Sequence, residues 1–432
     1  MLKVSVSPGP EGERELEVLG SAFNKILEEA GRQGYSRIYS YPHPDSVVAG
    51  IFIFKRMLAA GVRPVISVSM RPPEEIDAPT VLLGYDSVNY RAGDVEYTTI
   101  AMSTGEIRGK PVVNLYLFQG EGSVSALSLA AVSYSTGYKG SWDPLIALAG
   151  FYLGRYVSRS GKLHGMDKML ADELINVESY SLEAVTSLKV YKPHEGDVCE
   201  AIERTSNPFY PSLTGDREYC KSSLEAQNLG SMLESSVASL TGEELERFIE
   251  AVISIVRERA EWRNPEDYIE EYVGGYIISR QPLSPIQDVR MAADALVFAG
   301  EVGGLASMVA SSVDLEGEYQ IAERALEDYS ERLAEAVVTA KPRRVKLQIR
   351  YRVYSVDGER RDSPYLLWRA LYLKGLVERD SIIIVEDGEG ARISAFQAEL
   401  AAGYGAARRL VESKVAEGEG LALWVKTSAR QS

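Results

Sequence analysis

Three residues near the start of the chain have types and spacing that could bind a divalent metal ion. His43 and Asp45 stand between a short apolar stretch and an apolar, helix-like segment. Ligand sites in α/β sheets usually lie where a strand leads into a helix. Asp86 follows a second apolar stretch in the same way. His43, Asp45 and Asp86 are therefore the candidate metal ligands of this sequence.

These three side chains are too few for a pair of divalent ions. Two adjacent ions need bridging and flanking carboxylates to offset their mutual repulsion, and Asp45 and Asp86 supply only two. A single Mn²⁺ or Mg²⁺ ion, held weakly by Asp45 and Asp86, is an alternative. We favour a structural role, in which both acids cap a helix or end a strand in solvent. The sequence thus predicts no catalytic residue, no metal site and no cofactor.

Strands and helices alternate around these residues. The expected helices are at 13–31, 47–58, 123–135 and 144–157, and the expected strands are at 37–40, 65–68, 81–83, 97–102 and 112–118. Such alternation is typical of an α/β domain with a mostly parallel sheet and helices on both faces. We place this domain at 1–185.

The rest of the chain divides at the Pro-containing stretch 281–285. Before it lies a helical connecting region, 186–284, in which Thr241 and Glu244 form a capping-box pattern ahead of an amphipathic helix. After it, 285–432 is expected to be a smaller α/β domain. Its expected elements are a long helix at 319–338, a half-exposed strand with a basic face at 345–352, and a strand at 381–385. The apolar stripe of the long helix is expected to be Ile321, Ala325, Leu326, Tyr329 and Leu333.

Bulk composition limits the function classes. The formal charge of −15 disfavours a self-sufficient DNA-binding protein, because grip on phosphates needs Lys and Arg. No apolar run is long enough to span a membrane, so we expect no membrane partner. Cys199 and Cys220 are expected to be unpaired thiols of a cytoplasmic protein. Many charged residues and few cysteines are typical of thermophiles.

The stretch around Asp45 resembles the DHH phosphoesterase superfamily, and in particular its archaeal RecJ-like branch. Members carry His-x-Asp-x-Asp-Gly after the first strand. Here Tyr41 stands at the His, His43 at the first Asp, Asp45 at the second Asp and Ser46 at the Gly. Asp86 matches the acid that the family carries after the next strand. Of the three ligands in the first motif, only Asp45 is retained.

Later positions depart from the family in the same direction. The stretch 114–116, Asn-Leu-Tyr, replaces the Asp-His-His triplet, and Gly154 and Arg155 stand where a fourth acid is expected. The tail, 416–426, lacks the Gly-rich loop with its His, whose N–H groups would cradle a phosphate. The resemblance therefore implies that both the metal site and the phosphate loop are lost.

Two further stretches extend the resemblance over most of the chain. Residues 205–215 resemble a turn of archaeal RecJ-like proteins, and residues 294–304 resemble the start of the DHH-associated second domain, of DHHA1 type. The resemblance thus implies two family domains joined by the connecting region.

The RecJ-like branch includes non-catalytic replisome subunits, among them the eukaryotic cell-division-cycle forty-five protein. The resemblance implies an inactive scaffold of the archaeal replicative helicase, which binds the GINS complex and supports the MCM helicase in DNA replication. One alternative is a divergent manganese-dependent exonuclease for single-stranded DNA, or a phosphoesterase, using Asp45 and Asp86. Another is a single-strand-binding module that does not bind GINS.

Two charged stretches are candidate contact surfaces. Residues 243–271 hold ten acids against four arginines, and 341–374 hold ten basic residues, three acids and several aromatics. Basic residues interleaved with aromatics suit single-stranded DNA, although a solvated surface is the simpler interpretation of both stretches. The candidate contact residues are Arg343, Arg344, Lys346, Arg350, Arg352, Tyr354, Arg360 and Arg361.

Overall fold

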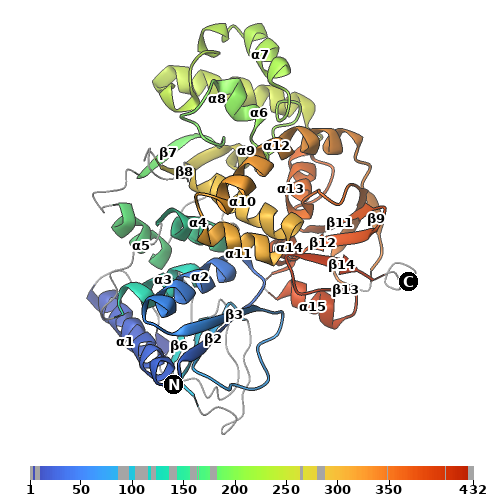
Figure 1. Cartoon of the computed structure of the whole chain (residues 1–432). Coiled ribbons are helices and arrows are strands. Elements are labelled where there is room, and N and C mark those ends of the chain that lie inside the picture. Colours follow the sequence, from blue (N-terminus) through green and yellow to red (C-terminus); the bar gives the residue numbers. More distant parts are fainter. Residues whose placement is uncertain are drawn as a thin grey trace.

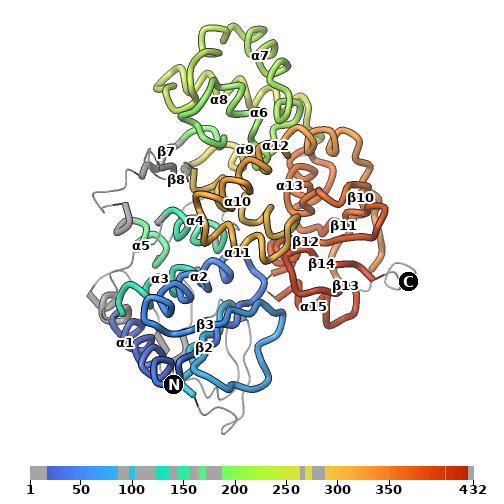
Figure 2. The backbone as a smooth tube through the Cα atoms, viewed as in Figure 1, coloured from blue at the N-terminus to red at the C-terminus, as the bar shows by residue number. Residues whose placement is uncertain are grey.

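The structure is a computed structural model with two six-stranded sheets and a helical region between them in sequence (Figure 1). It describes residues 3–4, 10–85, 97–102, 115–117, 123–135, 144–155, 163, 165–175, 182–262, 266–279, 288–347, 349–403 and 405–426. None of the described helices is both long and apolar enough to cross a membrane. The first sheet and the second sheet lie apart, with helices α10 (Val289–Phe298) and α11 (Leu305–Val313) running between them (Figure 2).

The first sheet has the order β1-β6-β5-β4-β2-β3, and all its paired strands are parallel. Its strands are β1 (Lys3–Val4), β2 (Tyr35–Ser40), β3 (Arg63–Val68), β4 (Thr80–Leu83), β5 (Thr99–Met102) and β6 (Leu115–Leu117). Strands β4 and β5 are buried at every position, as expected for a parallel sheet covered on both faces. The predicted α/β class with a mostly parallel sheet is confirmed.

Helices cover this sheet and build its core. They are α1 (Pro10–Gln33), α2 (Pro44–Ala59), α3 (Val124–Ser133), α4 (Pro144–Arg155) and α5 (Gly165–Ile175). Helix α2 packs against α3, α4 and the strands β2 and β3, and α10 packs on α4. Twelve of the sixteen residues of α2 are buried, and the segment just before it, 41–43, is buried as well.

The second sheet has the order β13-β14-β12-β11-β10-β9, with β10 and β11 parallel and the other pairs antiparallel. Its strands are β9 (Arg343–Val345), β10 (Arg352–Asp357), β11 (Ser381–Asp387), β12 (Gly390–Ser394), β13 (Ala416–Glu417) and β14 (Ala422–Val425). Helices α13 (Pro364–Lys374), α14 (Ala395–Ala402) and α15 (Ala406–Glu412) belong to this part.

The single strand predicted at 345–352 is wrong. The chain turns back between β9 and β10, which pair antiparallel through Val345 and Val353. Leu347, Ile349 and Tyr351 of the connecting segment pack against the core of the second sheet. Their alternation with charged residues therefore comes from a turning segment with an apolar side, which resembles a strand in sequence.

The connecting region contains helices and one small sheet. Its elements are β7 (Leu182–Leu188), α6 (Val198–Glu203), α7 (Arg217–Ala226), short 3₁₀ turns at Gly230–Met232 and Val237–Ser239, α8 (Gly242–Arg259), α9 (Glu266–Tyr272) and β8 (Val273–Ser279), and β7 pairs antiparallel with β8. Thr241 is the N-cap of α8, but its side chain makes no capping hydrogen bond, so the predicted capping box is not formed. The domain limits 1–185, 186–284 and 285–432 stay predictions.

The long helix predicted at 319–338 is α12 (Glu318–Thr339), which follows α11 and a π-helical turn at Ala299–Gly303. Its apolar face is formed by Tyr319, Leu326 and Tyr329 with their neighbours. Ile321 is 63% exposed and Ala325 is also exposed, so the predicted stripe was wrong at these two positions. The buried face is displaced around the helix because α10 and α13 pack against it.

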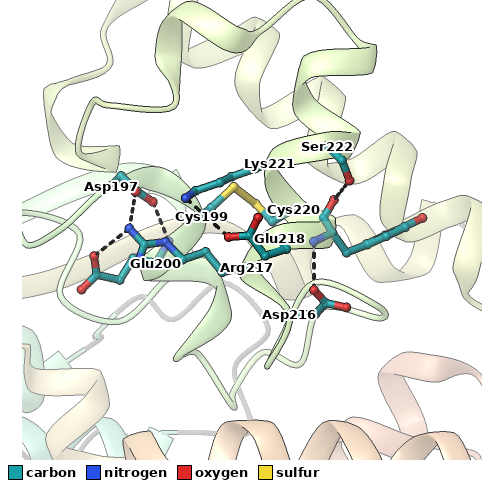
Figure 3. The surroundings of a disulfide bond; sticks show 10 residues. Asp197, Cys199, Glu200, Asp216, Arg217, Glu218, Cys220, Lys221 and Ser222 are labelled. Carbon is teal, nitrogen blue, oxygen red and sulfur yellow. Dashed lines mark hydrogen bonds and ion pairs between the residues drawn. A yellow bond between two sulfur atoms is a disulfide. The ribbon is translucent and has the colours of Figure 1, made fainter.

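The two cysteines are paired, which corrects the prediction of free thiols. Cys199 of α6 and Cys220 of α7 form a disulfide and are fully buried (Figure 3). An ion pair between Arg217 and Asp197, 2.5 Å, joins the same two segments. Packing of α6 on α7 brings the Cα atoms of the two cysteines to 5.7 Å from each other. The amino-acid composition gives no sign of this contact.

Candidate functional site

Asp45 lies in the first turn of α2, directly after strand β2, and is 1% exposed. Its two carboxylate oxygens accept hydrogen bonds from the backbone N–H groups of Val124 and Ser125, each at 2.8 Å, and from the Ser125 hydroxyl. Asp45 thus binds the first turn of α3. Burial raises the pKa of Asp45 to about 7, although these hydrogen bonds oppose the shift.

A second buried acid completes this cluster. Asp167 of α5 accepts hydrogen bonds from the backbone N–H of Ser123, 2.8 Å, and from its hydroxyl, 2.7 Å. The Ser123 hydroxyl in turn accepts from the N–H of Ala126, as an N-cap does. Sequence reasoning missed Asp167, Ser123 and Ser125. A signal was present only for Ser123, because Ser directly before an apolar helical segment is typical of an N-cap.

Gly154 of α4 sits against this cluster. A Cβ atom added at Gly154 would lie 2.9 Å from Oδ2 of Asp45 and 2.4 Å from Cβ of Ser123. Real Cβ atoms do not approach neighbours this closely, so the position has no room for a side chain. The family acid expected near Gly154 is therefore excluded from that position by packing. Arg155 ends α4, and its side chain lies outside the described part of the chain.

His43 and Tyr41 contact the second sheet's helices. The His43 ring is 7% exposed and lies edge-on to Phe396 of α14, with ring centroids 5.2 Å apart. Burial lowers the pKa of His43 to about 3, so the imidazole is neutral near pH 7. The Tyr41 hydroxyl donates to Oε1 of Glu399, 2.6 Å, and accepts from the backbone N–H of Arg408, 3.3 Å.

Glu399 ties this contact to the start of α15. It accepts hydrogen bonds from the backbone N–H groups of Ala406, 3.2 Å, and Ala407, 2.9 Å. Burial raises the pKa of Glu399 to about 7, opposed by the hydrogen bond from Tyr41. Sequence reasoning missed Glu399, because 358 positions separate it from Tyr41. The motif of the first domain is therefore an inter-domain joint.

The described residues of the motif do not fit a metal ion. Both oxygens of Asp45 are bound to α3, and His43 packs on an aromatic ring. Across the described ranges, no three or more His, Cys, Asp and Glu side chains form a group that could hold a metal. Asp86 and Asn114 lie outside the described residues.

The two stretches that extended the family resemblance meet in a buried polar network. Asn207 donates to Asp294, 3.0 Å, and Tyr191 donates to the same carboxylate, 2.8 Å. Arg369 of α13 donates to Asn207, 3.3 Å, and forms a buried ion pair with Glu271, 2.9 Å. Burial raises the pKa of Asp294 to about 7. The network joins the connecting region to the second domain.

The basic candidates are divided between ion-paired and unpaired positions. Arg343 pairs with Asp357, 2.8 Å, and Glu386, 3.8 Å; Arg352 pairs with Glu378, 3.1 Å; and Arg360 pairs with Glu389, 2.6 Å. The Tyr354 hydroxyl donates to Glu378, 2.6 Å, and Arg361 is exposed. Arg344, Lys346, Arg350 and Arg352 line one hollow of about 680 Å³. The structure thus brings four of the eight candidates together.

The acidic stretch 243–271 is divided between α8 and α9. Phe248, Val252 and Val256 form the buried face of α8. The acids of α8 face solvent, namely Glu243, Glu244, Glu246, Glu250 and Glu258. Three arginines of the same helix, Arg247, Arg257 and Arg259, are also exposed, so the exposed surface of α8 is acidic by a small excess of five acids over three arginines.

No protein-family model and no curated protein matches the chain. Among solved structures, the chain is similar to CDC45 from Entamoeba histolytica, with a TM-score of 0.59 and 12% identity over 95% of each chain. RecJ from Thermus thermophilus in complex with Mn²⁺ gives a TM-score of 0.40 and 12% identity, over 99% of this chain and 53% of that chain. We draw no argument from the second likeness, because its score is low.

The arrangement of a parallel sheet, a helical connection and a second mixed sheet is a CDC45-like fold over nearly the whole chain. The resemblance predicted from the motifs is thus confirmed at the level of the fold. The archaeal branch stays a prediction.

Proposed function

We propose that this chain is a non-catalytic RecJ-like subunit of a replicative helicase in the archaeal cytoplasm. It binds the GINS complex and supports the MCM helicase by positioning, with no chemistry of its own. The fold supports a place in the replisome, since it is similar to that of CDC45. The proposal requires no cofactor.

One observation carries the proposal. The residues at the family's first metal motif, Tyr41, His43 and Asp45, hold the protein together. In an active member, the side chains at these motif positions must face a space that holds ions and substrate. Here Phe396 of the second domain packs on the His43 ring, and Glu399 of the same domain accepts a hydrogen bond from Tyr41. A motif used as an inter-domain joint supports the loss of catalysis.

The acidic face of α8 is the proposed contact for a basic surface of GINS or MCM. Complementary charge steers association and fixes orientation more than it adds affinity. The test is co-elution of the purified chain with GINS in size-exclusion chromatography at physiological salt, followed by an MCM unwinding assay. We expect co-elution and faster unwinding. If GINS never co-elutes, the replisome role is wrong.

A matched pair of variants locates the contact. Glu246→Lys with Glu250→Lys reverses two exposed charges of α8, whereas Asp328→Lys with Glu335→Lys makes the same change on the exposed face of α12. We expect the α8 variant to lose co-elution and the α12 variant to keep it. Equal behaviour of the two variants would exclude α8 as the contact.

The enzymatic alternative has its own test. The chain is incubated with Mn²⁺ and 5′-labelled single-stranded DNA, beside an Asp45→Ala, Asp86→Ala double variant. We expect no degradation by either protein. Degradation by the wild type that disappears in the double variant, while circular dichroism shows that the variant is folded, would overturn the non-catalytic proposal and favour a manganese-dependent exonuclease.

A further inference from the structure

The hollow beside strand β9 has an unusual balance of charge. Arg344, Lys346 and Arg350 line it, are exposed, and form no ion pair with any residue of the described ranges. The neighbouring Arg343 and Arg352, in contrast, are paired with acids. Three positive charges without an ion pair to a described residue thus line one concave surface of a chain whose net charge is −15, and Arg344 also lies within electrostatic reach of Glu378.

Apolar side chains form part of the same surface. Leu347 and Ile349 line the hollow and are half-buried, because their inner sides pack against the core of the second sheet. An occupant would therefore meet both cations and aliphatic carbon within one hollow of about 680 Å³. This combination suits a ligand that carries alternating negative and apolar groups.

The hollow also adjoins a sheet edge. Strand β9 ends the order of the second sheet and pairs only with β10 among the described strands. The outer backbone groups of such an edge can hydrogen-bond to an added strand, and side chains that alternate along this strand then meet the pockets beside it.

We propose that this hollow binds an extended, acidic segment of a partner protein. Carboxylates of the segment pair with Arg344, Lys346 and Arg350. Its apolar side chains rest on Leu347 and Ile349, and its backbone adds to β9. The inference deepens the proposed scaffold role, because it names the kind of segment through which a partner would attach.

Single-stranded nucleic acid fits the hollow less well. Three free cations would neutralise about three phosphates, which gives little affinity at physiological salt. Base stacking needs accessible aromatic rings. Tyr351 is the one aromatic residue among the described residues that line the hollow, and it is half-buried.

The test is fluorescence anisotropy with a short labelled peptide in which glutamate alternates with leucine. The triple variant Arg344→Glu, Lys346→Glu, Arg350→Glu is expected to weaken binding about tenfold or more. The control Arg360→Glu, Arg361→Glu, Lys414→Glu makes the same change in net charge outside the hollow, at exposed residues, and is expected to bind like the wild type. Circular dichroism checks that all three proteins are folded.

Altered probes test each contact without changing the protein. Proline at alternate peptide positions removes the N–H groups that strand addition needs, and lysine in place of glutamate removes the charge attraction. Both peptides are expected to bind at least tenfold more weakly. Equal binding of the glutamate peptide to the triple variant and the control would overturn the proposal.

Two other outcomes would also overturn it. Preferential binding of oligothymidylate, lost in the triple variant, would identify a nucleic-acid site. Binding of neither probe would mean that the cations only protect the edge of the sheet from unwanted pairing. Peptide binding is measured on the isolated chain, so it can succeed even if GINS does not co-elute, and the two proposals fail independently.

Discussion

Two polar regions of this protein differ in what their charged groups contact. At the inter-domain joint, Tyr41 and Asp45 direct their polar atoms to the protein itself and are almost fully buried. At the hollow beside β9, Arg344 and Arg350 are exposed and form no ion pair with the described residues. The joint is therefore expected to govern stability, and the hollow is expected to govern binding.

This difference shows that the family resemblance alone does not identify the surface that is open to a partner. The resemblance draws attention to the joint, where the family has its catalytic ligands. The structure gives that region a structural task, because buried polar groups must be satisfied by internal partners. Groups left unsatisfied toward solvent are the ones available to another molecule.

The largest effect is expected for Asp45→Ala. This variant leaves the N–H groups of Val124 and Ser125, and the Ser125 hydroxyl, without their carboxylate acceptor in a buried site. Each unsatisfied buried donor costs about 1–3 kcal/mol, so the free energy of unfolding should fall by roughly 3 kcal/mol or more. Urea denaturation monitored by circular dichroism measures it.

Asp77→Ala is the matched control for Asp45→Ala. Asp77 is exposed and pairs with Arg37 at 2.6 Å, and a surface pair of this kind contributes about 1 kcal/mol or less. If Asp45→Ala and Asp77→Ala lower the free energy of unfolding equally, Asp45 does not hold α3 as described. The inter-domain joint would then contribute no more to stability than a surface ion pair.

The second prediction concerns pH. The folded pKa of Glu399 is about 7, above its ordinary value of 4.5. Between these two values the folded chain holds a proton that the unfolded chain has released, so the free energy of unfolding falls as pH rises through this window. The Glu399 contribution should amount to about 2 kcal/mol between about pH 5 and about pH 8.

Glu399→Gln isolates this contribution, because an amide does not titrate. Asp45, Asp294 and Glu301 also have pKa values raised to about 7, so both proteins keep some dependence on pH of the same sign. The free energy of unfolding of the wild type, relative to that of Glu399→Gln, should fall by about 2 kcal/mol as pH rises from about 5 to about 8. A difference that is constant with pH would show that Glu399 is ionised in the folded protein throughout.

A smaller effect is expected for Tyr41→Phe. The variant removes the hydroxyl that donates to Glu399 and accepts from the N–H of Arg408. The free energy of unfolding should fall by about 1 kcal/mol. The pKa of Glu399 should rise further, because the hydrogen bond from Tyr41 lowers it. A pH titration of stability that keeps its midpoint in Tyr41→Phe would contradict the contact.

The sequence was sufficient for features that depend on local patterns. The strands β2 to β5 and the helices α2, α3 and α4 were expected from apolar runs, because short apolar runs favour buried strands and long ones favour buried helices. A structural role for Asp45 was also expected from the shortage of acids. The helix that Asp45 binds begins 79 positions further on, and no pattern near Asp45 identifies it.

Features that depend on contacts between distant segments were missed or wrong. Cys199 pairs with Cys220 only because α6 packs on α7. In the sequence, Glu399 looks like any other acid of a helix, because its role depends on the packing of α14 against Tyr41. The segment 346–351 has the alternation of a strand, yet its apolar residues pack on the second core from a turn. A true strand and this turning segment show the same alternation in sequence, and they differ only in what their apolar residues pack against.

The smallest effect on stability is expected for Arg350→Ala, and it separates the two regions most clearly. Arg350 is exposed and has no ion pair with the described residues, so the free energy of unfolding should change by less than about 0.5 kcal/mol. The same variant should weaken binding of the glutamate peptide several-fold, since one of three cations is lost. Urea denaturation and anisotropy on one preparation measure both quantities. A loss of stability comparable to that of Tyr41→Phe would mean that Arg350 serves the fold, and the division between a joint that stabilises and a hollow that binds would be wrong.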